Sequence, residues 1–167
     1  MKARLIIGFL LAALGFWSYF VAYPYFIQAA IEWKISKGKN ILLHSKLPTS
    51  KTPDSPNPDF IYSIAFYDLQ DGDLLLTGKV PEGLDYFSIA FYGSNTLFYS
   101  IVKPDQKSDT YTIRLVKKSQ RTTDNNQMII ESPSEKGTLI LRYMCRNSRD
   151  LTSIAKIQEV TRLSSVP

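Results

Sequence analysis

The longest feature of the hydrophobic pattern is a run without charged side chains from Leu5 to Ile31. An α-helix rises about 1.5 Å per residue, so roughly 20 apolar residues cross the hydrocarbon core of a bilayer. Lys2 and Arg4 precede the run. The pattern predicts one N-terminal transmembrane helix over residues 1–37, with the lipid bilayer as its partner. Rings that favour the membrane interface gather in its second half and at its end: Trp17, Tyr19, Tyr23, Tyr25 and Trp33.

A cleaved signal peptide is the alternative to an anchor. Its apolar segment is about 7–15 residues long and ends at a small-x-small cleavage site. The run here is much longer, and Ile27 and Gln28 stand two places before Ala29 and Ala30. We therefore predict an uncleaved anchor. Basic residues flank both ends of the run, so charge leaves open which side of the membrane the rest of the chain occupies.

Residues 38–59 contain four prolines, Pro48, Pro53, Pro56 and Pro58. Each proline lacks a backbone donor and favours extended geometry in the residue before it, so neither a helix nor a central strand can run here. Such a segment is typical of a tether between an anchor and a domain. We expect His44, the only histidine, to face solvent in this tether.

From residue 60 onward, short apolar and aromatic runs alternate with turn residues and carry no helical pattern between them, which favours an antiparallel β-sandwich. The stretch 148–160, SRDLTSIAKIQEV, places Leu151, Ile154 and Ala155 on one side and predicts an amphipathic helix that closes on the sandwich. We therefore predict that residues 60–167 form an all-β domain with a C-terminal helix. The predicted strands are Phe60–Asp68, Leu74–Gly78, Tyr86–Tyr92, Leu97–Val102, Thr110–Val116, Gln127–Ser132 and Thr138–Met144.

Composition narrows the function classes. The formal net charge of +5 is modest, and without a clustered basic motif it indicates a solvated surface and no nucleic-acid partner. Cys145, the only cysteine, follows Leu139 and Leu141 with a period of two, which predicts a buried side chain far from His44. Phosphate loops, nucleophile elbows and histidine pairs are absent from the sequence. We expect no catalytic residue, no metal and no cofactor.

Asp68, Asp71 and Asp73 form the densest acidic cluster. Their oxygens could hold calcium, but the EF-hand pattern with its bidentate glutamate is missing. A hairpin turn uses Asp and Gly for backbone reasons alone, so we interpret the cluster as a hairpin turn.

Two groups of residues are weak candidates for ligand binding. Asn57, Asp59 and Tyr62 surround the start of the first predicted strand, where Asn and Asp side chains can also bond the local backbone. Tyr86 and Tyr92 alternate with Phe87 and Phe91 and therefore occupy the opposite strand face. Tyrosine on an exposed sheet favours protein interfaces and sugar-stacking sites, although burial on both faces is the simpler interpretation.

Three stretches stand out together: SPNPDFIYSIAFYDLQDGDLLL, DYFSIAFYGSNTLF and SPSEKGTLILRYMCRNSRDLTSIAKIQEVTRL. In order and spacing they resemble the bacterial domain-of-unknown-function 1254 family. They are similar to its NPD opening, its tyrosine-rich second strand and its closing strand and helix, and the resemblance covers Ser55 to Leu163. This chain departs from the pattern at Asp73, Asp85 and Gly93, where the family usually has Pro, Arg and Asp.

The resemblance implies a jelly-roll-like β-sandwich in a bacterial envelope protein, and longer members carry a second domain behind this one. It also implies a single-pass protein of the inner membrane with its soluble domain in the periplasm, and no established catalytic residue. We therefore expect a non-catalytic interaction module that docks a companion envelope protein or forms a homo-oligomer. The alternative is a binding domain or enzyme that acts on a small envelope ligand, such as a carbohydrate or lipid.

Overall fold

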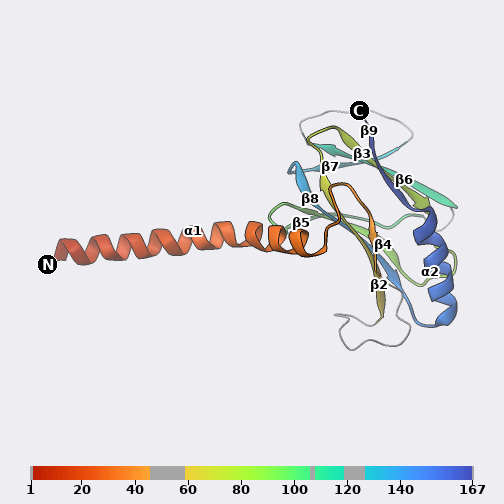
Figure 1. Cartoon of the computed structure of the whole chain (residues 1–167), viewed down its shortest axis with the longest axis horizontal. Helices are drawn as coiled ribbons and strands as arrows, with labels where there is room; N and C mark the ends of the chain where they lie inside the picture. The colour runs from red at the N-terminus through yellow and green to blue at the C-terminus, as the bar shows by residue number, and fades with distance from the viewer. Residues whose placement is uncertain (1, 46–58, 106–107, 119–126, 167) are drawn as a thin grey trace.

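A long N-terminal helix leads into a mostly β domain in the computed structural model, which describes residues 2–45, 59–105, 108–118 and 127–166 (Figure 1). The helix α1 covers Lys2–Ile35 and continues through Pro24. It ends two residues before the predicted end of the anchor at residue 37, and the following Gly38 has a φ of 148°, which favours glycine. Its most apolar window has a mean hydropathy of 2.1 and no buried residue. By length and composition, α1 can cross a membrane.

The described residues of the domain form two sheets. The first has the order β1-β2-β8-β4-β5, and all its neighbours are antiparallel. The second has the order β7-β6-β3-β9 and is mixed, because β6 and β7 run parallel. The strands are β1 (Leu43–His44), β2 (Phe60–Asp68), β3 (Asp73–Lys79), β4 (Phe87–Gly93), β5 (Phe98–Val102), β6 (Thr110–Lys117), β7 (Met128–Ser132), β8 (Lys136–Met144) and β9 (Arg162–Val166).

The prediction of a β-rich domain with a helix at each end is confirmed. All seven predicted strands exist within two residues of their predicted bounds. The pattern missed β1 and β9, which are short, and it missed the parallel pairing of β7 that makes the second sheet mixed rather than antiparallel.

Both sheets contribute to one hydrophobic core. Leu74 and Ile113 of the second sheet and Phe91 and Leu141 of the first belong to the same cluster and are at most 1% exposed. The helix α2 (Ser148–Val160) adds Ile154 to this core and lies on the side of the domain away from the N-terminus of α1 (Figure 1). Its predicted start is confirmed, because Asn147 and Asp150 form a capping box.

The acidic cluster does not form the predicted hairpin. Its turn connects β2 in the first sheet with β3 in the second, so the two strands do not pair. Asp68 forms an ion pair with Lys39 at 2.6 Å, and Asp73 forms one with Arg114 at 2.8 Å. Two of the three aspartates therefore bind cations of the chain itself.

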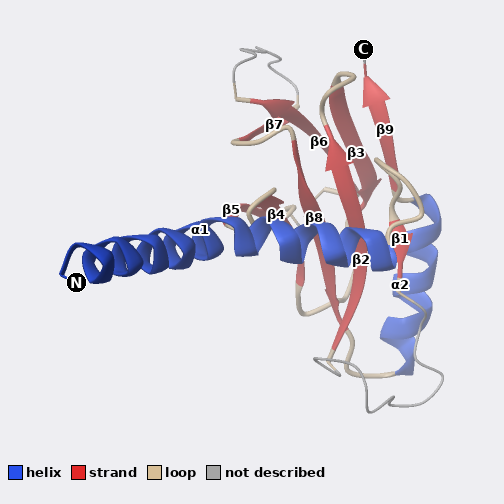
Figure 2. Cartoon of the chain, turned by 60° about the vertical axis from the view of Figure 1, so that its left-hand side comes forward, coloured by secondary structure: helices blue, strands red, loops and turns tan. Residues whose placement is uncertain are grey.

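The C-terminal part of α1 lies across the outer face of the first sheet (Figure 2). Gln28 Nε2 donates to Thr138 Oγ1 on β8 at 2.6 Å. After the helix, Asn40 bonds the backbone of Asp68 through both side-chain atoms, at 2.7 and 3.0 Å. His44 is exposed but pairs with Ser63, and its Nδ1 lies 2.8 Å from Ser63 Oγ. Residues 39–45 of the predicted tether thus contact the sheet.

Candidate binding site

The outer face of the first sheet carries aromatic and apolar side chains. Strand alternation places Ile61 and Ala65 in the core and leaves Phe60, Tyr62 and Ile64 half-buried on the outside. α1 covers one part of this face, around Ile64, Phe66 and Thr138. The remaining part is open to solvent, and we call it the aromatic face; it consists of Phe60, Tyr62, Tyr86, Tyr92, Ile140 and Arg142.

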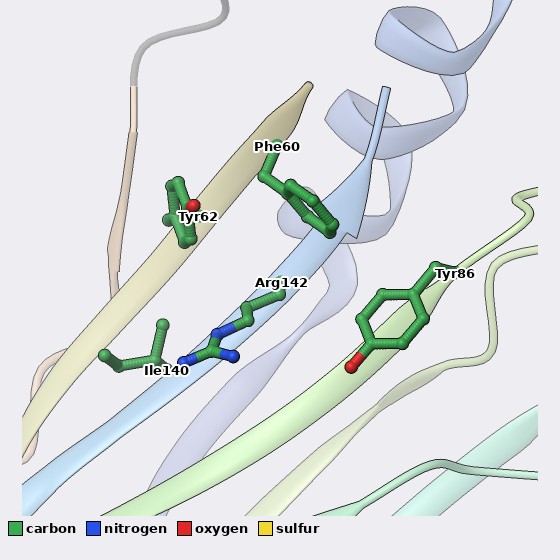
Figure 3. A pocket seen from close by; sticks show the side chains of 5 residues that line it. All are labelled: Phe60, Tyr62, Tyr86, Ile140 and Arg142. Carbon is green, nitrogen blue, oxygen red and sulfur yellow. The ribbon is translucent and has the colours of Figure 1, made fainter. Parts of the chain in front are cut away.

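A hollow of about 200 Å³ lies in the aromatic face and is lined by all of these residues except Tyr92 (Figure 3). β2 provides Phe60 and Tyr62, β8 provides Ile140 and Arg142, and Tyr86 comes from the residue before β4. The Phe60 ring meets the Tyr86 ring edge to face, with 5.8 Å between centroids. Such arrangements stabilise aromatic pairs beyond their buried area.

Among the described residues, Arg142 is the only charged one that lines the hollow. Its Nη2 donates to Tyr92 Oη at 2.5 Å, which holds the guanidinium over the strands. In the described part of the chain, Arg142 forms no ion pair with a carboxylate. A guanidinium has five donors in a planar fork that suits a carboxylate or phosphate. The geometry therefore leaves donors of a half-buried cation for an external group.

Ser88 adds a second polar group beside the arginine. Tyr62, Arg142 and Ser88 are direct register partners on β2, β8 and β4, so their side chains share one face. Ser88 is 0% exposed, and its hydroxyl has no hydrogen-bond partner among the described residues. A buried hydroxyl without a partner is unfavourable unless something else bonds it.

The structure brings together three of the five predicted candidates. Tyr62 and Tyr86 line the hollow, and Tyr92 bonds Arg142. Asp59 lies at the start of β2, where its carbonyl accepts from the backbone of Cys145 at 2.8 Å, and Asn57 lies outside the described residues. Arg142 is not among the predicted candidates, although its alternation with Leu141 and Tyr143 places it on the outer face.

The other reactive side chains lie elsewhere. Cys145 is half-buried against the core, and burial raises the pKa of its thiol, which disfavours the nucleophilic thiolate. Burial likewise lowers the pKa of His44 on the edge strand β1. No group of three or more potential metal ligands occurs in the described ranges. The aromatic face itself offers rings for stacking, hydrogen-bond donors and one positive charge.

Comparison with known proteins extends this description. The model of the protein family of unknown function DUF1254 matches residues 40–165. No curated protein matches the sequence. Two of the residues that depart from the family pattern form ion pairs within the chain. Asp73 pairs with Arg114, and Asp85 pairs with Arg146 at 2.6 Å.

Two solved structures share the fold. A protein from Vibrio parahaemolyticus matches with a TM-score of 0.68 at 9% identity, over 89% of this chain and 35% of its own length. An uncharacterized protein from Burkholderia cenocepacia matches with a TM-score of 0.52 at 15% identity, over 94% of this chain and 42% of its own length. This chain thus spans well under half of either protein, and at these identities the likeness concerns the fold alone.

Proposed function

We propose that this chain, which belongs to the DUF1254 family of unknown function, is a membrane-anchored interaction module. Its jelly-roll-like sandwich docks a companion envelope protein through the aromatic face, without catalysis. The observation that carries this proposal is Arg142, a half-buried arginine among tyrosines that forms no ion pair within the described residues. Arg and Tyr are the side chains most enriched at the energetic centres of protein interfaces.

The proposed membrane anchor is α1. The proposed location is the bacterial inner membrane, with the domain in the periplasm. Every large apolar side chain from Leu5 to Val21 is more than half exposed. Exposed apolar surface on this scale is unfavourable in water, since burial contributes roughly 25 cal/mol per Å². A bilayer removes that cost.

The positive charge of Arg142 indicates which side chains the companion protein presents to the aromatic face. The guanidinium of Arg142 and the hydroxyls of Tyr62 and Tyr92 can donate hydrogen bonds to a carboxylate. We therefore infer that the companion presents an acidic side chain, flanked by apolar residues that pack on Phe60 and Tyr86. The overall charge of +5 favours the approach of such a partner.

A small envelope ligand is the second candidate, because aromatic rings around an arginine also suit an acidic sugar. Pockets for small ligands usually measure about 300–1,000 Å³ and enclose most of the ligand. The hollow measures about 200 Å³ and lies open on a sheet surface. Its size suits one inserted side chain better than a whole ligand, which favours the protein partner.

Photo-crosslinking in bacterial cells tests the proposal on the full chain. With p-benzoylphenylalanine in place of Tyr62, we expect a crosslink to one companion protein, and none with the same probe at Val160 on the distant helix α2. Arg142→Gln should weaken binding by about 2 kcal/mol or more, which is roughly a thirtyfold loss of affinity. Arg142→Lys should restore part of it, since it keeps the charge without the fork.

Three outcomes would contradict the docking proposal. A crosslink only to a second copy of the chain would assign the aromatic face to a homo-oligomer. A crosslink that persists unchanged in Arg142→Gln would remove the role of the charge. Absence of any crosslink, together with chemical-shift changes at Tyr62 on addition of galacturonate, would favour the small-ligand alternative.

A further inference from the structure

A second exposed apolar surface lies at the hairpin between β4 and β5. Leu97 is 65% exposed and Phe98 is 53% exposed, and Ile101 of the same edge strand is also exposed. We call these three residues the apolar rim. In both views, β5 lies at the side of the domain from which α1 extends toward its N-terminus (Figures 1 and 2). Large exposed apolar side chains that gather in this way usually mark an interaction surface.

The rim continues into the surface between α1 and the sheet. The Phe98 ring contacts the Tyr92 ring edge to face, with 5.8 Å between centroids. Tyr92 in turn lines a mainly apolar hollow of about 330 Å³ together with Gln28 and Ile31 of α1. Helix, hollow and rim thus form one continuous apolar surface.

The backbone of the hairpin is fixed at some cost. Thr96 has a φ of 62°, a left-handed conformation that is unfavourable for a β-branched residue. Hydrogen bonds hold it there: Gly93 N donates to Leu97 O at 2.9 Å, and Ser94 N donates to Ser134 Oγ at 3.1 Å. Strain of this kind concentrates at functional segments. Here it presents Leu97 and Phe98 at the tip of an anchored turn.

The length of α1 sets the distance between the rim and the bilayer. A span of roughly 20 residues that begins at Leu5 ends near Pro24. Gln28, which bonds the sheet at Thr138, is four residues farther, or about 6 Å along the axis. The headgroup layer on each side of the hydrocarbon core is about 5–8 Å thick. The sheet therefore meets α1 within the headgroup layer, and a longer span brings it closer still.

We propose that the apolar rim inserts into the lipid surface beside α1, so that the domain lies on the membrane rather than swinging on a tether. The occupant is the lipid interface, since α1 requires a bilayer on the side to which β5 projects. This proposal rests on the proposed anchoring by α1. Insertion at two points, α1 and the rim, fixes which way the domain faces.

Spin labels on the full chain, reconstituted in vesicles of phosphatidylcholine and phosphatidylglycerol, test this proposal. Single cysteines replace Leu97, Leu10 or Val160 in a Cys145→Ser background. Leu10 reports on the anchor, and Val160 is an exposed apolar control at the end of α2. We expect labels at 97 and 10 to collide severalfold more often with oxygen than with an aqueous nickel chelate, and the label at 160 to show the reverse.

The outcomes separate this inference from the anchor itself. A lipid-exposed label at 10 with an aqueous label at 97 would overturn the rim proposal and leave the anchor intact. Aqueous labels at both positions would overturn both. If Leu97→Cys fails to fold, judged by near-UV circular dichroism, Phe98→Cys provides the second site for the same comparison.

Discussion

Two buried tyrosines should respond in opposite ways to loss of a hydroxyl. Tyr67 and Tyr143 are 2% and 0% exposed, and both belong to the core shared by the sheets. The Tyr67 hydroxyl lies 2.8 Å from Ser132 Oγ, 3.0 Å from Tyr99 Oη and 3.0 Å from the Tyr92 carbonyl. The Tyr143 hydroxyl has no hydrogen-bond partner among the described residues. The pair therefore isolates the hydrogen bonds from the ring.

We expect Tyr67→Phe to lower the free energy of unfolding by about 2–3 kcal/mol, because it removes the hydrogen bonds of a buried hydroxyl to the Tyr92 carbonyl, Tyr99 and Ser132. For a domain of this size, that corresponds to a fall in melting temperature of roughly 10 °C. Tyr143→Phe should leave stability unchanged or raise it by up to about 1 kcal/mol, because it removes a buried polar atom without a bond.

Urea unfolding of the full chain in detergent, followed by near-UV circular dichroism, measures both differences. Equal losses in the two variants would refute the reasoning, because the packing of the removed oxygen atom, which both variants lose, would then explain the effect without hydrogen bonds. The double variant Tyr67→Phe/Tyr99→Phe adds a cycle: if the two hydroxyls form one network, its loss should fall short of the sum of the single losses. The Tyr67 network also bonds β4 at the register shift beside Tyr92, and thereby supports the aromatic face.

Three further predictions concern other parts of the chain. Gly137→Ala should destabilise the domain by about 1–3 kcal/mol, because a methyl group there meets the Tyr92 carbonyl and the Tyr67 hydroxyl. Gly15→Ala, in open space on α1, should be neutral in the same urea-unfolding assay. Burial raises the pKa of Asp68. Lys39, the Gln70 amide and Lys136 lower this pKa by more than burial raises it, so the net pKa lies below 3.8. The ionised Asp68 carboxylate contributes to stability above pH 3.8, and this contribution is lost as the pH falls through the lowered pKa. Lys39→Gln should therefore move acid unfolding to higher pH, whereas the control Lys37→Gln should not. Alkaline phosphatase fused to the C-terminus should be active, because the proposed topology exports the domain; an inactive fusion beside an active cytoplasmic reporter would reverse the orientation.

Local pattern was sufficient for most of the fold. Strand β4 follows from the alternation within residues 86–92, and helix α2 follows from the one-sided spacing of Leu151, Ile154 and Ala155, because both patterns are local in the sequence. The parallel pairing of β6 with β7 could not be predicted, because it depends on how a long connection returns to the sheet. β9 follows α2 as the mainly polar stretch RLSSV, which carries too few apolar residues to indicate a strand.

The junction after α1 shows the same limit. Residues 38–45 contain no strand signal strong enough to separate them from the proline-rich segment that follows. In the structure, the Asn40 side chain forms hydrogen bonds with both the N–H and the carbonyl of Asp68, as the backbone of a paired strand would, and Leu42 packs against the core. These contacts join residues 28 positions apart, which no local pattern reports. The same holds for Arg142, whose role depends on Tyr92, 50 residues earlier in the chain.

The first sheet serves both the anchor and the candidate site, and this limits how a partner can approach. α1 bonds the sheet through Gln28, and Tyr92 borders the hollow beneath α1 while it also bonds Arg142. The aromatic face therefore lies directly beside α1. With α1 anchored in a bilayer as proposed, Arg142 would stay close to the lipid surface, within reach of membrane-bound partners. The search of such a partner would be confined to the plane of the bilayer, which raises its effective concentration at the site.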